Sequence, residues 1–425
     1  MKSSFNDPGE PVHVKKPLFY GWIIVASCFL LQTVQVAIQY GFSVFFKPLI
    51  AEFEWSRTAT SGAYSVLMLA AGISAIPLGW LGDRFGPSKV LVGCSFIIGL
   101  SLVLTSRITE IWQFYLTYGI LQGLGMGGTF AISTGLTSRW FVKKRGLAMG
   151  FVSAGVGVGT LIGPPISERL IANFGWSSSY LFIGFATWVI MIAASIFLRR
   201  DPLGMGLLPY GADARPSISY ARNDLSKFPS QASSVTMGSA LRTRQLWLLI
   251  FLFFLFSVCV QLVLVHLVNY ATDLGIDPFT AATIVSVIGI GSIAGRLFSG
   301  SMSDRLGEKN AMIISCLGLV VALILLIFSN QLWMLYVFAV LFSFSYGAEV
   351  TLMPLLAGQI FGLAAVMALT GVVSASARVG GAVGSWMGGA IFDSTQSYSI
   401  AFIIAAVFGI VIVSLAVTLK RTKTS

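Results

Sequence analysis

The stretch AATIVSVIGIGSIAGRLFSGSMSDRLG, Ala281–Gly307, places an arginine in the middle of an apolar segment. Arg296 stands among isoleucine, glycine and alanine, and the apolar run ends in a polar turn. A second apolar stretch, Val366–Gly389, carries Arg378 near its centre. A charge at the centre of a bilayer costs at least about 2.5–3.5 kcal/mol, so it normally faces a cavity or a partner. Two such cations predict a cavity that holds an anion.

The overall composition is that of a membrane protein with many spans. Hydrophobic residues make up 56% of the 425 positions and charged residues only 10%, whereas about 25% of the residues of a soluble domain are charged. A helix needs about 20 apolar residues to cross a bilayer. Twelve segments approach this length: 18–46, 58–80, 88–106, 111–135, 146–171, 177–198, 245–271, 279–302, 308–329, 332–357, 363–390 and 396–419. We therefore predict an all-α membrane protein with twelve transmembrane helices.

The predicted segments fall into two groups of six. The expected parts are an N-terminal tail (1–17), a first six-helix half (18–198), a linker loop (199–243), a second six-helix half (244–419) and a C-terminal tail (420–425). The halves repeat one another, since GWLGDRFG at Gly79–Gly86 returns as GSMSDRLG at Gly300–Gly307, an offset of 221 residues. Two matched halves are typical of a secondary transporter whose site lies between them near the midplane of the bilayer.

The positions of the basic residues predict the orientation in the membrane. If both termini are cytoplasmic, 21 of the 27 lysines and arginines lie in cytoplasmic loops and tails, 4 in outer loops and 2 within helices. This distribution follows the positive-inside rule, so the net charge of +11 reflects topology and predicts no nucleic-acid partner. The first 17 residues lack the apolar core and cleavage site of a signal peptide. We expect a cytoplasmic tail and a plasma-membrane protein, located in the inner membrane of a Gram-negative cell.

Several motifs resemble those of a known transporter family. GWLGDRFG between the second and third segments, and its copy GSMSDRLG between the eighth and ninth, look like the loop motif of the major facilitator superfamily. Gly155, Gly159, Gly163 and Pro164 resemble the glycine-proline motif of that superfamily's fifth segment. The resemblance covers both halves of the chain. It implies the major facilitator fold, with two six-helix pseudo-repeats, and a monomer by default.

Within that superfamily, three features resemble the monocarboxylate transporter and oxalate/formate antiporter group. They are Tyr20-Gly-Trp22 with VFFK at Val44–Lys47, WFVKKRGLAMG at Trp140–Gly150, and Phe174-Gly-Trp176. In that group an arginine in segment 8 binds the substrate carboxylate, and Arg296 stands at the matching place. The oxalate/formate antiporters add a second cation in segment 11, which Arg378 would supply.

The chain departs from the animal monocarboxylate transporters at two positions. Their segment-1 lysine, which is linked to proton coupling, is replaced by Tyr40 when the sequences are aligned on VFFK. The aspartate that they carry four residues before the segment-8 arginine is replaced by Ser292. The resemblance therefore supplies no route for protons through these two positions.

The two arginines are the first candidates for substrate binding. At the offset of 221 residues Arg296 aligns with Ala75 and Arg378 with Gly157, so the cations belong to the second half alone and are not repeated scaffold. A guanidinium can donate two parallel hydrogen bonds to a carboxylate. The alternative is a structural salt bridge from one of them to Glu349, the one acidic residue predicted to lie inside the membrane.

Other polar side chains on the predicted helices are candidates for the same cavity. Substrate contacts are predicted for Tyr40, Tyr118, Gln122 and Tyr346, for which helix packing is the alternative, and for Asn269, for which an outer gate is the alternative. His266 and Glu349 are the candidates for a coupled proton, and histidine titrates near physiological pH. The alternative for His266 is a packing histidine with satisfied hydrogen bonds.

Charged residues near the cytoplasmic ends of the helices predict a gate. Asp83 and Arg84 recur as Asp304 and Arg305 in the repeated motif. We predict a charge latch between helices that closes the cytoplasmic side in one state, with solvation of the loops as the alternative. Arg145 either joins this latch or anchors at lipid headgroups.

Together these patterns predict a secondary active transporter of small organic carboxylates such as lactate or pyruvate, proton-linked and working by alternating access. The alternative is an oxalate/formate-type antiporter of dicarboxylate and monocarboxylate; a non-carboxylate facilitator or an anion sensor fits less well. The sequence holds no GxxxxGK[ST] phosphate loop, no nucleophile–base set and no metal-ligand cluster, so we expect no enzyme activity, cofactor or metal. The expected partners are the carboxylate, protons or a counter-anion, and membrane lipid.

Overall fold

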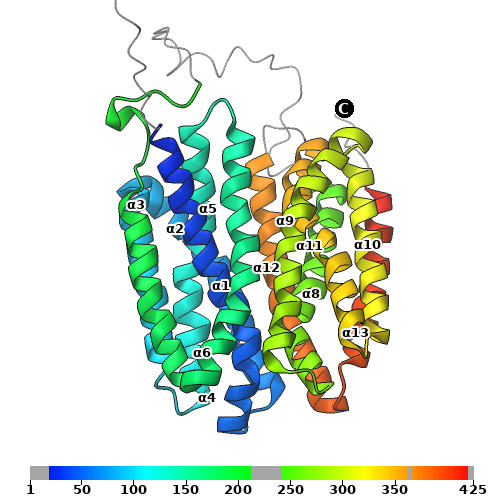
Figure 1. Cartoon of the computed structure of the whole chain (residues 1–425). Coiled ribbons are helices and arrows are strands. Elements are labelled where there is room, and N and C mark those ends of the chain that lie inside the picture. The colour runs from blue at the N-terminus through cyan, green and yellow to red at the C-terminus, as the bar shows by residue number, and fades with distance from the viewer. Residues whose placement is uncertain (1–18, 212–240, 362–365, 420–425) are drawn as a thin grey trace, which may run out of the picture.

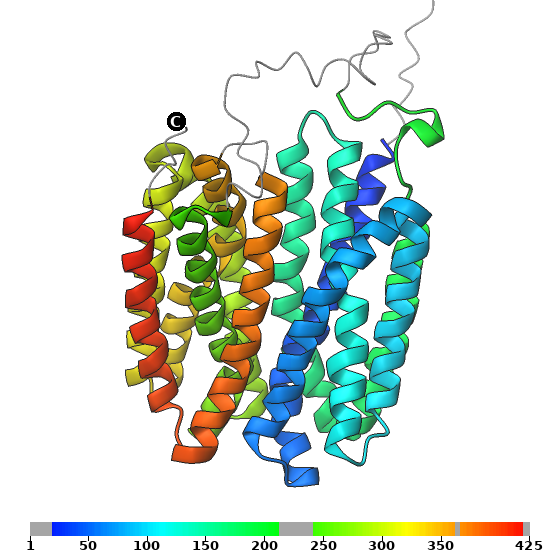
Figure 2. The same ribbon diagram turned by 180° about the vertical axis from the view of Figure 1, so that it is seen from behind.

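The computed structural model describes residues 19–211, 241–361 and 366–419, which form a bundle of long helices. The first half consists of α1 (Gly21–Phe53), α2 (Arg57–Phe85), α3 (Pro87–Thr105), α4 (Ile111–Phe114), the π-helix η1 (Tyr115–Leu121), α5 (Gln122–Trp140) and α6 (Arg145–Ile196). The second half consists of α8 (Arg244–Asp273), α9 (Pro278–Leu306), α10 (Glu308–Phe328), α11 (Leu332–Phe361), α12 (Val366–Thr395) and α13 (Ser399–Thr418). Figures 1 and 2 show the two groups standing side by side. The predicted tails and most of the predicted linker lie outside the described residues; its first part contains the short turn η2 (Leu203–Met205).

The helix α6 covers two of the predicted segments and folds back on itself. Gly175 inside it has φ 74° and ψ 166°, a backbone conformation that glycine adopts far more readily than other residues. Its second part runs antiparallel to α3, because Ser177 donates to the Ser106 carbonyl (2.7 Å) at one end and Ser88 donates to the Ser195 carbonyl (2.8 Å) at the other. The total of twelve transmembrane helices stays a prediction.

The repeated loop motif forms the same turn in both halves. Gly86 joins α2 to α3 with φ 94°, and Gly307 joins α9 to α10 with φ 82°. These φ values lie in the region that a side chain disfavours, which explains the final glycine of both GWLGDRFG and GSMSDRLG. The repeat found in the sequence is therefore a repeat of local structure.

Each half has its own apolar core, and apolar side chains also cover the outside of the bundle. Phe42 and Phe114 belong to the core of the first half, and Phe256 and Phe342 to that of the second. Within the described ranges, nine helices are long and apolar enough to cross a membrane. Large apolar side chains such as that of Phe328, 67% exposed, suit a surface in contact with lipid tails. The predicted all-α membrane fold is confirmed.

We name the two ends of the bundle by its helices. The inner end is the end at which α1 begins and α13 ends, and the outer end is the opposite one (Figure 1). The turns at Gly86 and Gly307 lie at the inner end, whereas α2 begins and α8 ends at the outer end. The charge distribution predicts that the inner end faces the cytoplasm.

Candidate functional site

The two halves touch along the outer part of their interface. Between α2 and α12, the Ser65 hydroxyl donates to the Ala382 carbonyl at 2.7 Å. Between α6 and α9, the Ser286 hydroxyl donates to the Leu161 carbonyl at 2.7 Å. Gly289 allows this second pair of helices to approach closely, since it packs directly on the Leu161 backbone. The outer end of the interface is therefore closed.

The halves part toward the inner end. On the face of α2 that meets α12, Gly72 touches the Arg378 side chain, but Ile76, one turn further inward, is 81% exposed. On α6, Gly157 packs against α9, whereas nothing within the described part of the chain lies within 4 Å of the place where a Cβ on Gly150 would be. The conformation is therefore closed at the outer end and open at the inner end.

Arg296 lies at the inner limit of the closed zone and bridges the two halves. It projects from α9, is 9% exposed, and its Nη1 donates to the Ser153 carbonyl of α6. Its Nε and Nη2 are buried and have no hydrogen-bond partner among the described residues. These two nitrogens form one edge of the guanidinium, which can donate two parallel hydrogen bonds to a carboxylate. A buried charge with two unused donors is unfavourable unless a ligand pairs with it.

Arg378 approaches the same region from α12. Its guanidinium is near enough to Tyr64 and Tyr40 to interact with them electrostatically, and Arg296 interacts in the same way with Tyr40 and Tyr346. Tyr40 is thus a common neighbour of the two arginines. We find no hydrogen bond or ion pair from the Arg378 guanidinium to any residue that the structure describes. The two cations that the sequence singled out therefore share one neighbour, Tyr40, from different helices of the second half.

Hydrogen bonds between the halves lie on the outer side of the arginines. The hydroxyl groups of Tyr40 on α1 and Tyr346 on α11 are 3.0 Å apart. The Tyr64 hydroxyl on α2 accepts from Gln39 Nε2 at 3.0 Å and donates to Gln261 Oε1 on α8 at 3.1 Å. The site is therefore lined by helices of both halves, as the repeat predicts. Tyr64 and Gln261 are missing from the sequence-based candidates, although a polar side chain within an apolar segment is the same signal that points to Tyr40.

Glu349 supplies the acidic group of the site. It is 8% exposed, follows Tyr346 by three residues on the same face of α11, and interacts electrostatically with Arg296. It forms no ion pair with any described residue, so the structural salt bridge considered from the sequence is not made in this conformation. Gly347 between these two residues packs on the backbone of Arg296, which holds α11 against α9.

Two predicted substrate residues lie inside the first half and not in the site. Tyr118 stacks on Phe42 with ring centroids 5.0 Å apart, and Phe42 stacks on Tyr64 at 5.3 Å, so Tyr118 is one ring removed from the interface. Gln122 is fully buried, and neither of its amide atoms has a partner in the described ranges. Tyr118 lies within the π-helix Tyr115–Leu121, whose turn is wider than that of an α-helix, and Gln122 follows it directly.

His266 and Asn269 lie further out along α8. His266 is buried, with Nε2 2.8 Å from the Ser385 carbonyl and Nδ1 3.2 Å from the Tyr398 hydroxyl. Asn269 donates to a carbonyl of its own helix at 3.3 Å. They follow Gln261 by five and eight residues, or about 7 and 12 Å along the helix. The structure therefore places them beyond the site, toward the outer end.

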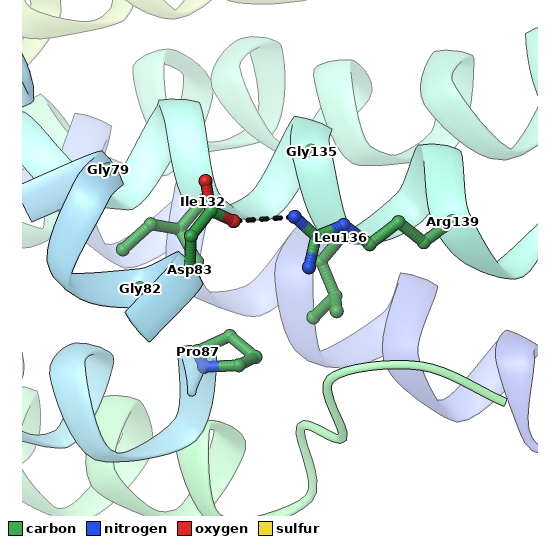
Figure 3. Close-up of a pocket in the computed structure, with 8 residues that line it drawn as sticks. All are labelled: Gly79, Gly82, Asp83, Pro87, Ile132, Gly135, Leu136 and Arg139. Carbon is green, nitrogen blue, oxygen red and sulfur yellow. Dashed lines mark hydrogen bonds and ion pairs between the residues drawn. The ribbon is translucent and has the colours of Figure 1, made fainter. Parts of the chain in front are cut away.

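The charged residues of the repeated motif lie at the inner end. Asp83 forms an ion pair with Arg139 of α5 at 2.5 Å, beside a cavity of about 170 Å³ (Figure 3), and both residues belong to the first half. The other motif residues, Arg84, Asp304 and Arg305, are exposed. The side chain of Arg145 lies outside the described part of the structure. A latch between the halves stays a prediction, because the inner ends are apart in this conformation.

Comparison with known proteins gives the class of the chain. The sequence model of the Major Facilitator Superfamily matches this chain in two overlapping ranges, residues 28–328 and 264–425. The chain belongs to the Major Facilitator Superfamily. Its family and fold are those of transporters rather than of enzymes.

Within the superfamily, the chain resembles the monocarboxylate transporter group. It is 26% identical to monocarboxylate transporter 12 of Rattus norvegicus, over 95% of this chain and 87% of that protein. It is 27% identical to monocarboxylate transporter 13 of Rattus norvegicus, over 92% and 86%, respectively. Similar solved structures include a D-xylose–proton symporter (TM-score 0.75, 15% identity, 95% of this chain and 99% of that one). Another is a bacterial homologue of the human lysosomal transporter Spinster in an inward-facing, occupied conformation (TM-score 0.70, 13% identity, 96% and 98%).

Proposed function

We propose that this protein carries small organic carboxylates across the membrane by alternating access. The substrate would be a monocarboxylate such as lactate or pyruvate, with its carboxylate on the free edge of Arg296. Arg378 and the hydroxyl groups of Tyr40 and Tyr346 would surround the rest of the molecule. The similarity to monocarboxylate transporters and the position of these groups between the two halves support this proposal.

The unpaired edge of Arg296 is the observation that carries the proposal. Its Nε and Nη2 are buried where the two halves begin to part, and a carboxylate would accept from both. Two arginines against the single acidic group of Glu349 favour an anion over a cation. When the inner end closes over a bound carboxylate, water leaves the ion pair and its hydrogen bonds strengthen. Occupancy of the site would thus lower the barrier between the two conformations.

Glu349 is the group that we propose for proton coupling. It is buried near Arg296 and forms no ion pair with a described residue, which supports a role in exchanging a proton as the substrate arrives. Protonation would remove its negative charge and leave Arg296 to the substrate alone. Asp83, Arg84, Asp304 and Arg305 are proposed to latch the inner end when it closes.

The alternative is an exchange of dicarboxylate against monocarboxylate, of the oxalate/formate type. It is favoured by Arg378, whose guanidinium has no ion-pair partner among the described residues and could hold a second carboxylate. For either substrate we propose a monomer in the plasma membrane with both termini in the cytoplasm. The excess of basic residues in the loops at the inner end supports this orientation.

Uptake of labelled L-lactate into proteoliposomes tests the proposal. In the wild-type protein an inward proton gradient should drive accumulation. The change Arg296→Lys keeps the charge but removes the planar fork. We expect uptake at low lactate concentration to fall at least tenfold, because a hydrogen bond to a charged group contributes about 1.5–3 kcal/mol. The exposed Arg107, changed to lysine, is the matched control and should transport normally.

The outcomes separate the two candidate substrates. If lactate does not enter with or without the gradient, exchange of oxalate against formate is measured next. If Arg296→Ala carries carboxylates at the wild-type rate, the carboxylate does not bind where we propose.

A further inference from the structure

A second polar cluster joins the two halves at the outer end of the bundle, away from the arginine site. We call it the outer clasp, and it consists of Lys47, Arg57, Asp273, Asp393 and Tyr398. These residues come from α1, α2, α8, α12 and the position just before α13. The outer ends of α2 and α12 lie next to each other in Figure 2. The clasp therefore ties two helices of the first half to three elements of the second.

Arg57, the first residue of α2, is the centre of the clasp. Its two terminal nitrogens donate to the two carboxylate oxygens of Asp273 at 2.7 and 3.0 Å, and Nη1 also donates to the Tyr398 hydroxyl at 2.7 Å. The guanidinium lies 3.6 Å from the ring centroid of Phe392. Lys47 adds a second cation, with its Nζ 2.6 Å from Oδ1 of Asp273. The Arg57 side chain is only 14% exposed, so this paired and stacked cation is held more firmly than an isolated surface ion pair.

Asp393 caps the start of α2 from the opposite half. Its carboxylate accepts from the backbone N–H of Arg57 at 3.0 Å and of Thr58 at 2.7 Å. The N-terminus of a helix carries free N–H groups and a partial positive charge, both of which favour a carboxylate. Ser56 accepts from the N–H of Ala59, so the two caps satisfy different groups. When the halves separate at the outer end, α2 loses one of its two caps.

A chain of hydrogen bonds leads from the clasp into the protein. The Tyr398 hydroxyl accepts from Arg57, and its own hydrogen is directed to His266 Nδ1, 3.2 Å away. His266 Nε2 must carry a hydrogen, because its partner 2.8 Å away is the Ser385 carbonyl, which only accepts. Phe46 packs edge-on against the imidazole, with ring centroids 5.4 Å apart. His266 thus fixes the Tyr398 hydroxyl beneath Arg57.

We infer that the outer clasp is the outer gate of this transporter and that His266 is a positioning residue of the gate. The bonds of the clasp join opposite halves, so they stabilise the conformation that is open at the inner end and must break before the outer end opens. His266 acts through Tyr398 and touches no substrate. The inference rests on the proposed alternating access but not on the identity of the substrate. A measurement of gate opening in the absence of substrate therefore tests the gate separately from the proposed carboxylate transport.

The test uses a single reporter cysteine beneath the gate. Ser65 lies in the closed part of the interface and is 9% exposed, and the native cysteines are at most 2% exposed, so Ser65→Cys should be the main site of labelling once the outer end opens. The full-length protein in lipid nanodiscs is treated with a maleimide, which reaches both faces of the membrane. Adding Arg57→Gln or Asp393→Asn should raise the labelling rate about tenfold, which corresponds to about 1.4 kcal/mol. Arg107→Gln is the matched control and should leave the rate unchanged.

The labelling rates of Arg57→Gln and Asp393→Asn either support or overturn the assignment of the gate to the clasp. Faster labelling in both clasp variants, in samples that remain monodisperse and melt as cooperatively as the parent, assigns the gate to the clasp. Unchanged labelling in both variants overturns the inference, whatever lactate uptake shows.

A second set of variants tests His266. We expect His266→Ala to raise labelling of the reporter about fivefold, and Arg57→Gln combined with His266→Ala to label no faster than Arg57→Gln alone, because the residues act in one chain. In His266→Asn the amide oxygen can take the place of Nδ1 as acceptor for Tyr398, so the rate should return to near that of the parent. Two outcomes would show that His266 only fills space. Either the increases in labelling rate caused by Arg57→Gln and His266→Ala multiply in the double variant, or His266→Asn is labelled as fast as His266→Ala.

Discussion

At Arg296 the guanidinium uses one nitrogen in a bond to the protein, and its other two nitrogens have no hydrogen-bond partner among the described residues. The bond from Nη1 to the Ser153 carbonyl fixes the plane of the group, so the orientation of the carboxylate that we propose would be set before it arrives. Such preorganisation reduces the entropy that is lost on binding. A lysine would supply the charge without the plane. The proposed site would therefore select for carboxylate geometry as well as for negative charge.

The change Glu349→Gln tests whether the acidic group of the site carries the coupled proton. Glutamine keeps the size and polarity of the side chain but cannot gain or lose a proton in this way. We expect lactate accumulation driven by a proton gradient to fall to the level seen without a gradient, while lactate–lactate exchange continues. Both are measured in the same proteoliposomes, with Glu168→Gln near the outer end of α6 as the control. Full accumulation by the Glu349→Gln protein would place the proton on another group.

At the scale of single helices, the direction in which a side chain points decides which candidates reach the site. Arg296 and Arg378 could be found from the sequence because a charge inside an apolar segment needs a partner or a cavity. Tyr118 carries the same sequence signal as Tyr40, but it lies in the π-helix Tyr115–Leu121 and its ring stacks on Phe42 in the core of the first half. The hydrogen-bonding pattern of a π-helix leaves no clear trace in the spacing of apolar and polar residues along the sequence.

The outer clasp shows a different limit of sequence reasoning. Arg57, Asp273 and Asp393 stand at helix ends, where charged residues are common and usually solvated. Their bonds join positions more than two hundred residues apart in the sequence, such as Arg57 and Asp273, 216 residues apart. The sequence could predict the two halves from their repeat, but the contact between them depends on how the finished halves pack.

Close packing of α6 on α9 makes a prediction at this scale. A Cβ on Gly289 would lie 2.5 Å from the backbone nitrogen of Leu161 and 3.0 Å from its Cα, and a backbone cannot swing aside as a side chain can. Gly289→Ala should push the two helices apart at a cost of about 1–3 kcal/mol. Because these helices belong to opposite halves, we expect labelling of the Ser65→Cys reporter to rise about fivefold or more. Gly150→Ala, where a Cβ meets open space, should not change it.

At the scale of the whole molecule, the interface between the halves differs from the interior of each half. Most of the apolar core lies within one half or the other, whereas the contacts between the halves include single hydrogen bonds, glycine contacts and the outer clasp beside a few apolar side chains such as Val44 and Val265. An interface of this kind can break and form again at modest cost, so that two conformations differ by only a few kcal/mol. The sequence therefore predicts the two halves from their repeat, but not which end of the interface is open.

A crosslink across the outer interface tests whether the halves must separate there. The Ser385 hydroxyl donates to the Ser61 carbonyl at 3.3 Å between α12 and α2, so a pair of cysteines at these two positions spans the interface. We expect the oxidised Ser61→Cys/Ser385→Cys protein to stop transport, to recover it on reduction, and still to bind lactate, because its site remains open at the inner end. Cysteines at Thr105 and Thr117, whose hydroxyl groups are 3.0 Å apart within the first half, form the matched control and should leave transport intact. Binding without transport would show that the outer contact is the one that the cycle has to break, whereas continued transport by the crosslinked protein would mean that substrate crosses the membrane without this separation.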